Sequence, residues 1–338
     1  MPDSIRNPKS MFTAASKAAA CLALLACLGL SGCVQANLSL FGEPGKPYKE
    51  QRLDGDGPDK VLLLGVDGLI SEHTRGLLRN RPSTVQELVA QLKLAREDKD
   101  IKAVVLKVDS PGGSTTASDI LYHELMTYKD ASKVKMVAAM MGLAASGGYY
   151  VSLPADHILA HPTTITGSVG VIFLQPRVAG LMEKLGLGVD VSKSGTLKDM
   201  GSPFRAATAE EKRLVDAMTR AQATRFLELV QLHRHLDPAA LGIVASARVF
   251  TAAEAKDLGL IDSVGYLDDA LAKAKELAGL PKDATVVTYR RRENPDGTYY
   301  LPGVEAEGAR PAVINLDLEG LLPPQAGLYY LWTPGYGQ

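Results

Sequence analysis

One serine, Ser146, stands in a run of small residues that suits nucleophilic chemistry. It lies in MGLAASGGYY (141–150), with two alanines before it and two glycines after it. Small residues allow a second backbone to come close, and the glycine pair frees the main chain to turn sharply. A serine presented in this way is suited to attack a peptide carbonyl held above it. The run also fits a crowded point where a helix starts against a sheet, so this pattern alone leaves both interpretations open.

A second run offers the hydrogen-bond donors that such chemistry needs. Acyl transfer through a serine develops negative charge on the carbonyl oxygen, and two donors must stabilise that charge. The segment SPGGS (110–114) follows an apolar stretch, and its glycine amides can approach a carbonyl closely. We expect the amides of Gly113 and Gly147 to be the two donors. A tight turn between a strand and a helix is the alternative interpretation of the glycine pair.

The third requirement is a general base, for which the histidines are poor candidates. None of the six lies in a motif with a partner acid, and two of them stand at the end of a predicted helix, where the helix dipole favours their charged form; the six are His73, His123, His157, His161, His233 and His235. A lysine is the other choice. The polar segment 191–205 offers Lys193 and Lys198. A lysine acts as a base only where desolvation lowers its pKa from about 10.4 towards neutrality.

Alternating strand and helix patterns indicate how these residues are positioned. Apolar runs at 60–70, 101–109 and 133–140 predict buried strands, and amphipathic segments at 83–100 and 115–131 predict helices between them. Shorter strands are expected at 157–161 and 168–174. This order predicts an α/β fold with a largely parallel sheet, whose ligands bind at the carboxyl ends of the strands. Both SPGGS and the Ser146 run lie at that edge.

The carboxyl-terminal half is predicted to be mostly helical. Thr208 with Glu211, and Thr251 with Glu254, have the spacing of capping boxes. The segment that follows residue 280 suggests a hairpin on Pro295-Asp-Gly. An extended tail then contains the apolar and aromatic sequence LPPQAGLYYLWTPGYG. The tail is expected either to pack on the domain as a strap or to lie as a peptide-like occupant in the cleft of its own or a neighbouring chain.

The amino end has the features of an export signal. Three basic residues precede an uncharged run from Ala18 to Leu30, which as a helix would rise about 20 Å and fall short of the roughly 30 Å hydrocarbon core of a bilayer. The run ends in Leu-Ser-Gly-Cys, which resembles the lipobox of bacterial lipoproteins and implies cleavage before Cys33 and acylation of that residue. All three cysteines lie in this leader, so the mature chain has no thiol pair for a disulfide.

Composition narrows the classes of function. The net charge is −1, and aromatic residues make up 6% of the chain, so neither a basic surface nor stacking platforms for nucleic acid are indicated. No zinc-binding motif is present, and we expect no metal and no cofactor. The 338 residues and 46% hydrophobic content suit a well-buried core.

Four ordered motifs resemble the signal peptide peptidase SppA family in its short, single-domain form. They are VDSPGGS, GLAASGGYYVSLPADHILAHPTTITGSVGV, KSGTLKDMGSPFR and RVFTAAEAKDLGLIDSVGYLDDAL, and together they cover roughly residues 60 to 280. The resemblance implies a ClpP/crotonase-like fold and a serine peptidase with a Ser/Lys dyad. Carried over by motif, Ser146 is the nucleophile, Lys198 rather than Lys193 is the base in a dry pocket, Ser168 orients the lysine, and Gly113 is an oxyanion donor.

The resemblance also implies partners and a cellular place. Relatives act on leftover signal peptides, and in short forms the serine and lysine of one site come from adjacent protomers of a ring or dome. We therefore expect a homo-oligomer, inactive as a monomer, that is lipid-anchored in the bacterial cell envelope, faces the periplasm and cuts signal peptides or other small peptides. Many relatives have a transmembrane helix instead of a lipidated cysteine, so inner and outer membrane both remain open.

The expected organisation is a signal peptide (1–32), a lipidated cysteine with a flexible tether (33–59), a peptidase domain (60–280), and a hairpin with an extended tail (281–338). Two alternatives remain. One is a crotonase-like enzyme of acyl-CoA compounds, which an exported protein would seldom meet. The other is a catalytically inactive lipoprotein scaffold that retains the fold.

Overall fold

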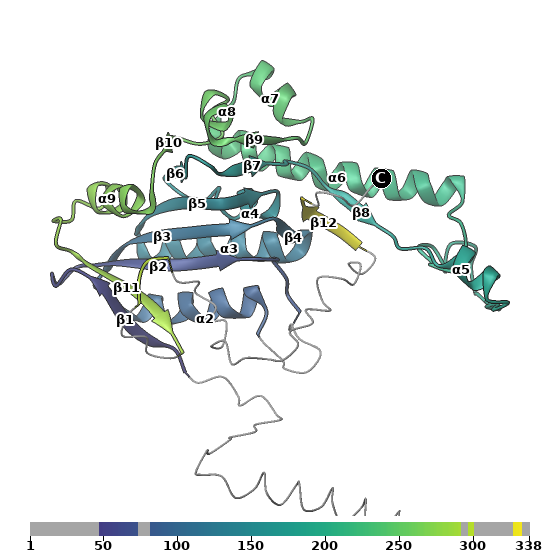
Figure 1. Ribbon diagram of the computed structural model, residues 1–338, viewed down its shortest axis with the longest axis horizontal. Coiled ribbons are helices and arrows are strands. Elements are labelled where there is room, and N and C mark those ends of the chain that lie inside the picture. Colours follow the sequence, from purple (N-terminus) through teal and green to yellow (C-terminus); the bar gives the residue numbers. More distant parts are fainter. Residues whose placement is uncertain (1–46, 74–81, 292–296, 301–326, 333–338) are drawn as a thin grey trace, which may run out of the picture. The chain divides into compact units, whose positions relative to one another are not determined.

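The computed structural model describes residues 47–73, 82–291, 297–300 and 327–332, which belong to one compact unit. Its centre is a nine-stranded sheet with helices on both faces. A separate three-stranded sheet lies at the carboxyl ends of the central strands (Figure 1). The pairs formed by β2, β3, β5 and β6 are parallel, so the predicted α/β fold with a largely parallel sheet is confirmed.

The large sheet follows the spatial order β1 (Lys49–Asp54), β11 (Thr285–Arg290), β2 (Lys60–Asp67), β3 (Ile101–Ser110), β5 (Lys135–Ala145), β6 (His157–Ala160) and β10 (Ser263–Val264). The end of β5 also pairs with β7 (Ile165–Gly167), which pairs in turn with β9 (Val249–Thr251). The small sheet has the order β4 (Gly112–Ser114), β12 (Gly327–Leu331) and β8 (Ile172–Leu174).

The helices of the described residues are α2 (Thr84–Glu97), α3 (Thr115–Ser132), α4 (Gly147–Tyr150), α5 (Ala179–Lys184), α6 (Ala209–Arg234), α7 (Pro238–Val244), α8 (Ala252–Asp257) and α9 (Leu267–Leu277). The capping boxes predicted from Thr208 with Glu211 and from Thr251 with Glu254 open α6 and α8. Each threonine accepts the amide of the residue three positions on, and the glutamate accepts the amide of the threonine.

The central strands are apolar on both faces because helices cover both. Leu62, Leu64 and Leu106 face the core formed with α2 and α3, whereas Val61 and Val105 face α9. Side chains alternate along a strand, so a continuous apolar run is what a sheet buried on both sides requires. This double burial fixes the carboxyl ends of β3 and β5, where the site residues begin.

The strands predicted at 60–70, 101–109 and 133–140 are present as β2, β3 and β5, and β5 continues as far as Ala145. The strand predicted at 168–174 is shorter, because the chain turns after β7. Gly167 has φ +86° and Ser168 has φ +51°, and only Ile172–Leu174 is extended beyond this turn. The turn separates β7 of the large sheet from β8 of the small one.

One sequence expectation is wrong. Residues 49–54 were expected in a flexible tether but form β1, whose polar composition is tolerated because β1 lies at the edge of the sheet, where it pairs with β11. The turn of the hairpin predicted on Pro295-Asp-Gly falls on residues 292–296, which lie outside the described residues, so the hairpin stays a prediction. β11, which precedes this turn, pairs with β1 on one side and with β2 on the other.

The signal peptide, Cys33 and most of the tether lie outside the described residues, as does most of the tail. Among the helices that are described, none combines the length and apolar character needed to cross a bilayer.

Candidate active site

Ser146 lies at the carboxyl end of β5 in a strained backbone conformation. Its φ is +54° and its ψ is −114°, a region that residues with a side chain seldom adopt. The turn is held by a hydrogen bond from the Ser146 amide to the Gly167 carbonyl at 2.8 Å, and α4 begins at the next residue. The side chain is 1% exposed, and its Oγ has no hydrogen-bond partner within the described part of the chain. A buried hydroxyl without a partner is costly, which indicates a functional position.

The two expected oxyanion donors lie next to each other. An added Cβ at Gly147 would come within 3.1 Å of the Gly113 nitrogen, and one at Gly112 would come within 2.6 Å of the Gly147 nitrogen. Gly147 is the first residue of α4, and the first amides of a helix have no partner inside it. The structure therefore brings Gly113 and Gly147 together beside Ser146, as the sequence predicts, with no room for a side chain on the glycines.

Ser168 is also close to the nucleophile. Ala145 pairs with Gly167 at the end of the parallel β5–β7 ladder. Ser146 directly follows β5 and Ser168 directly follows β7, so the two serines leave the sheet side by side. Ser168 is 8% exposed and has a positive φ, and its amide donates to the Arg248 carbonyl at 2.9 Å. Its position beside Ser146 is compatible with the orienting role that the family motif implies.

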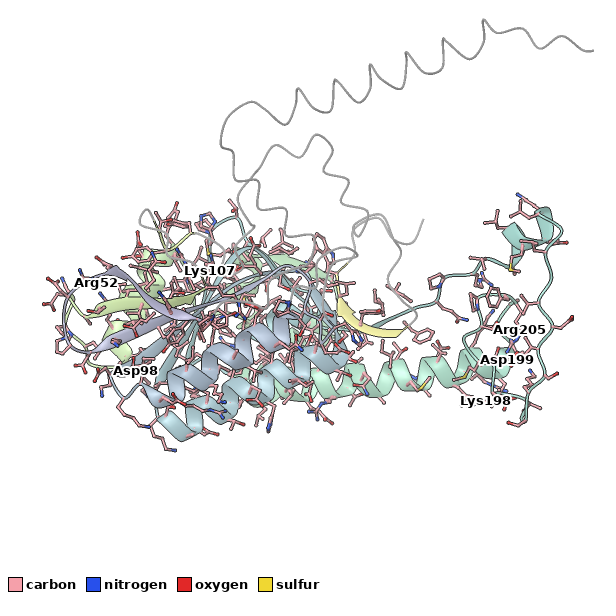
Figure 2. All side chains as sticks on the ribbon, turned by 90° about the horizontal axis from the view of Figure 1, so that it is seen from below. Arg52, Asp98, Lys107, Lys198, Asp199 and Arg205 are labelled. Atoms are coloured by element: carbon pink, nitrogen blue, oxygen red, sulfur yellow. The ribbon has the colours of Figure 1, made fainter. Side chains whose placement is uncertain are left out.

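Lys198 is not brought to Ser146 within one chain. It is exposed, and it belongs to the segment 175–208, which we call the arm and which joins β8 to α6. Figure 1 shows α5 of the arm at the end of α6 that lies away from the sheet, and Figure 2 shows Lys198 at that same end. The dry pocket expected around this lysine is therefore not formed by a single chain.

The arm is stabilised by an ion-pair cluster. Asp199 accepts hydrogen bonds from Lys193 at 2.7 Å and from Arg205 at 2.8 Å, and Arg205 also binds the buried carboxylate of Glu211 (Figure 2). The hydrogen bond from Arg205 and the amide of Thr208 lower the pKa of Glu211 to about 2. Lys193 is thus occupied in holding the arm. Within the described residues the Lys198 amine has no ion pair, which leaves it free to act on another chain.

Strand β12 lies in a slot between β4 and β8, beside the expected oxyanion donor Gly113. It pairs antiparallel with β4 on one side, placing Tyr330 opposite Gly113, and with β8 on the other, placing Leu328 opposite Phe173 (Figure 1). The Trp332 amide extends the pairing with a 2.9 Å bond to the Pro111 carbonyl. An extended segment that completes a sheet between two edges is the geometry of peptide recognition by strand addition. Of the two expectations for the tail, this geometry favours a peptide-like occupant.

The aromatic residues around the slot were missed by sequence reasoning. Tyr150, Phe226 and Tyr330 form one cluster, with ring centroids 4.8 to 5.0 Å apart. Tyr150 donates to Asp119 at 2.6 Å, and Arg225 binds the same carboxylate at 2.7 Å. The two tyrosines directly after Gly148 were the available signal, but nothing in the spacing connects them to α6 or to residue 330.

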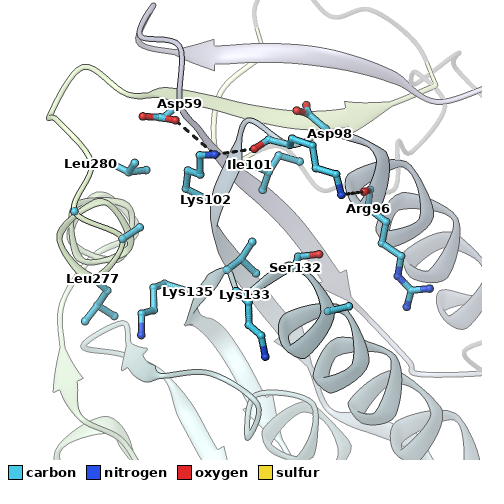
Figure 3. A pocket seen from close by; sticks show the side chains of 15 residues that line it. Asp59, Arg96, Asp98, Ile101, Lys102, Ser132, Lys133, Lys135, Leu277 and Leu280 are labelled. Carbon is cyan, nitrogen blue, oxygen red and sulfur yellow. Dashed lines mark hydrogen bonds and ion pairs between the residues drawn. The ribbon is translucent and has the colours of Figure 1, made fainter.

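A pocket elsewhere in the chain is not part of this site. It has a volume of about 490 Å³ and is lined by basic residues that include Lys102, Lys133 and Lys135, with Asp59 on its rim (Figure 3). It lies at the amino ends of β3 and β5, whereas Ser146 follows the carboxyl end of β5. Parallel sheets place their active sites at the carboxyl ends.

Comparison with known proteins identifies two family matches. Peptidase family S49 matches residues 128–281, and the Clp protease family matches residues 79–164. The latter match agrees with the ClpP-like α/β fold predicted from the sequence.

Individual relatives are similar over most of the chain. A protein of Enterococcus faecium assigned as a signal peptide peptidase SppA is 36% identical over 238 residues, which are 70% of this chain and 69% of that protein. A protein of Methanocaldococcus jannaschii assigned as a protease is 34% identical over 281 residues, which are 82% of this chain and 85% of that protein. Protease 4 of Salmonella typhi is 39% identical over 191 residues, covering 56% of this chain and 31% of that protein.

Two solved structures also match. A mutant of a membrane-bound stomatin-specific protease superposes with a TM-score of 0.41 and 16% identity, covering 65% of this chain and 86% of that one. A mutant of ClpP1 from Listeria monocytogenes has a TM-score of 0.40 and 16% identity, covering 62% and 94%.

Proposed function

Because the chain belongs to peptidase family S49, with the signal peptide peptidases SppA, and is a serine peptidase, we propose that it is an envelope endopeptidase that cuts signal peptides or other small peptides with a Ser146/Lys198 dyad. The observation that carries the proposal is the arrangement at the end of β5. A buried serine on a strained turn, whose hydroxyl has no hydrogen-bond partner among the described residues, lies beside two converging glycine backbones.

The dyad is proposed to form between two copies of the chain. Ser146 has a buried hydroxyl that needs a base, and Lys198 has an exposed amine that needs a desolvated pocket. A neighbouring copy supplies what each lacks. The arm also exposes Leu185, Leu187 and Phe204, apolar side chains that a second copy would cover.

The mechanism follows from these positions. In the assembled site the uncharged Lys198 accepts the proton of Ser146, and the Ser146 oxygen attacks the carbonyl carbon of the peptide. The amides of Gly113 and Gly147 stabilise the oxyanion of the tetrahedral intermediate. As the intermediate collapses, the protonated Lys198 gives its proton to the leaving amine, and an acyl-enzyme remains on Ser146. Water then enters, Lys198 takes its proton, and hydrolysis of the ester restores the serine. Ser168 is proposed to hold the lysine amine in line.

The proposed location is the bacterial cell envelope, with the domain facing the periplasm and tethered by lipid on Cys33. The support is the lipobox-like sequence and the short segment between Cys33 and β1. That segment has 15 residues between Cys33 and Lys49, so it spans at most about 50 Å when fully extended. The site is thereby kept near the membrane, where cleaved signal peptides are released.

The proposal is tested with the chain from residue 34, incubated with a synthetic signal peptide and with casein, and with the cuts mapped by mass spectrometry. Ser146→Ala is expected to lower turnover at least about 1000-fold while leaving the folded state intact, because it removes the proposed nucleophile and breaks no hydrogen bond within the described residues. The control is Ser152→Ala. Ser152 is a buried serine in the turn after α4, and its hydroxyl donates a hydrogen bond to the Gly148 carbonyl at 2.9 Å. Activity in Ser146→Ala equal to that of the control would refute the assignment.

A further inference from the structure

Ser110 lies between the end of β3 and the short strand β4, which carries the expected oxyanion donor. Its side chain is fully buried, with 0% exposed. Its hydroxyl donates to the Gly68 carbonyl at 2.6 Å and accepts the Gly112 amide at 3.1 Å. Pro111 has no amide hydrogen, so the Gly112 amide is the first donor that this turn offers. One buried hydroxyl therefore connects the segment after β2 to the start of β4.

The segment 68–70 in turn fixes the orientation of Gly113. Ile70 forms a parallel bridge with Gly113. The Ile70 amide donates to the Gly112 carbonyl at 2.9 Å, and the Ile70 carbonyl accepts the Ser114 amide at 3.0 Å. Backbone groups of successive residues in a strand point to opposite sides, so a neighbour that bonds to residues 112 and 114 leaves the amide of residue 113 on the other side. The amide of Gly113 therefore points away from Ile70.

Ser110 also contacts the turn that carries the nucleophile. A Cβ added at Gly148 would lie 2.6 Å from the Ser110 carbonyl oxygen and 3.4 Å from the Ser110 Cβ. A Cβ added at Gly147 would lie 3.0 Å from the Gly112 Cα and 3.1 Å from the Gly113 nitrogen. The first turn of α4 thus lies directly against Ser110 and against the glycine that its hydroxyl holds. The two turns that carry the expected oxyanion donors meet at this one residue.

We propose that Ser110 is a positioning residue for the oxyanion site, because its hydroxyl holds the Gly113 amide in the direction needed to stabilise the tetrahedral intermediate. The proposal rests on the proposed function and adds to it a residue that does not touch the substrate. Without the hydroxyl, the buried Gly112 amide loses this acceptor, and the Gly68 carbonyl loses the donor that ties segment 68–70 to β4. A displacement of about 1 Å at a catalytic group can lower a rate about 100-fold, so a small shift of this turn is enough to weaken catalysis.

The first experiment measures steady-state kinetics of Ser110→Ala. The protein is the chain from residue 34, and the substrate is a synthetic signal peptide. We expect kcat to fall about 10- to 100-fold and KM to change less than about threefold, because the oxyanion develops in the transition state and is absent from the bound substrate.

The matched control is Ser152→Ala. Ser152 is also a fully buried serine, and its hydroxyl donates to the Gly148 carbonyl at 2.9 Å. It therefore has the same burial and a similar hydrogen bond, but it does not contact β4 through that bond. The control should retain the wild-type kcat within about twofold.

A pair of inhibitors separates positioning from a general loss of structure. The Ser146 oxygen adds to the carbon of a peptide aldehyde, the serine proton passes to the Lys198 amine, and the former carbonyl oxygen becomes the tetrahedral oxygen that the two amides bind. The matching peptide alcohol has the same side chains but forms no adduct. Ser110→Ala is expected to weaken inhibition by the aldehyde about 10- to 100-fold and inhibition by the alcohol less than about threefold.

A second variant, Ser110→Cys, covers the case in which Ser110→Ala does not fold. Cysteine nearly keeps the shape of serine, but its thiol is a weak donor and a weak acceptor. It should therefore also lower kcat and weaken the aldehyde more than the alcohol. Unfolding temperatures show which variants are folded.

The outcomes distinguish the inference from the proposed function. If the folded Ser110 variants match Ser152→Ala in kcat and in the ratio of aldehyde to alcohol inhibition, the positioning role is wrong and the proposed function stands. Equal weakening of the aldehyde and the alcohol overturns the positioning role as well, because it indicates a structural role. If the wild-type chain neither cuts the peptide nor binds the aldehyde more tightly than the alcohol, the proposed function is refuted together with this inference.

Discussion

At the scale of single residues, the proposed dyad requires a choice between two nearby lysines. The sequence offers Lys193 and Lys198 in one polar segment, and only the family motif favours the second. The structure adds a physical reason, because Lys193 is bound to Asp199 and to the Thr196 carbonyl. A lysine held by a carboxylate is stabilised in its charged form and is a poor base.

This difference predicts the effect of removing the amine of Lys198. Lys198→Ala is expected to lower turnover at least about 1000-fold without changing the unfolding temperature, because the side chain is exposed in the single chain and a general base is lost. Lys184→Ala, an exposed lysine on α5 of the same arm, is the control and should retain wild-type turnover. Steady-state kinetics on a signal peptide make the comparison. Equal loss in the two variants would mean that the arm matters only for assembly.

The residues of the site were predictable to different extents, for physical reasons. Ser146, Gly113 and Gly147 are recognisable because close backbone approach requires small residues at adjacent strand ends, and the structure brings the three together. The aromatic cluster was not predictable, because its members come from α4, α6 and the tail, and contacts so distant in sequence leave no periodic pattern. Lys198 has no ion pair within the described residues, whereas Lys193 has one with Asp199, and spacing does not show this difference.

At the scale of elements, the order of strands and helices was predictable wherever burial or a helix cap leaves a recognisable pattern in the sequence. The runs of β2, β3 and β5 are apolar on both faces, and α6 and α8 begin at capping boxes. The elements that were missed are at edges. β1 is polar because it lies at the edge of the sheet. β4 is three residues of glycine and serine that become a strand by pairing with β12 and by a parallel bridge to Ile70.

The arm is the element whose order depends most on charge. Arg205→Ala removes the hydrogen bonds to both Asp199 and Glu211, so the arm should loosen and Lys198 should no longer be held for a neighbouring chain. We expect turnover to fall about 10- to 100-fold and trypsin to cut within 184–205 sooner, with the unfolding temperature of the core unchanged. Arg213→Ala, an exposed arginine on α6, is the control. An arm as resistant as that of the control would refute this role of the cluster.

The same cluster predicts how the arm responds to acid. Arg205 lowers the pKa of Asp199 and of Glu211, the latter to about 2. A carboxylate with a lowered pKa contributes its stabilisation above its unfolded pKa of about 4, and the contribution is lost as the pH falls towards the lowered value. Between about pH 4 and pH 2 the wild-type arm should therefore become as sensitive to pepsin as that of Arg205→Ala. Unchanged cleavage over that range would show that these ion pairs do not order the arm.

Strand β12 is predicted to compete with substrate, because it occupies the space between β4 and β8. Because β12 is part of the same chain, its effective concentration at the slot is about 1 mM. At micromolar concentrations of a free peptide, β12 should therefore occupy the slot in most molecules. Deleting residues 327–338 is expected to raise the rate on short peptides at least about tenfold, and to lower the unfolding temperature because the burial of Tyr330 is lost. Deleting only 333–338 leaves β12 in place and is the control. A rate that stays the same while the assembly persists would show that β12 does not block the site.

At the scale of the whole molecule, the two residues of the proposed dyad lie apart within one chain. Ser146 follows β5 of the sheet, whereas Lys198 lies on the arm at the far end of α6 (Figures 1 and 2). The first turns of α6 expose Leu214 and Met218, as the arm exposes Leu185, Leu187 and Phe204. The proposed contact between copies accounts for these exposed apolar side chains, because association would bury them and would bring Lys198 to Ser146 of a second copy.

Mixed oligomers test that explanation directly. Ser146→Ala and Lys198→Ala chains are each expected to be inactive alone, yet a co-expressed equal mixture should recover about a quarter of wild-type turnover, because half of the serine positions and half of the neighbouring lysine positions are intact. If both residues acted within one chain, the mixture would recover nothing. Wild type mixed equally with the Ser146→Ala/Lys198→Ala double variant separates the two arrangements again, since sharing between chains predicts about a quarter of the activity and a site within one chain predicts about half. Sedimentation of each mixture shows that the oligomers form equally, so the recovered fraction reports on where the lysine comes from.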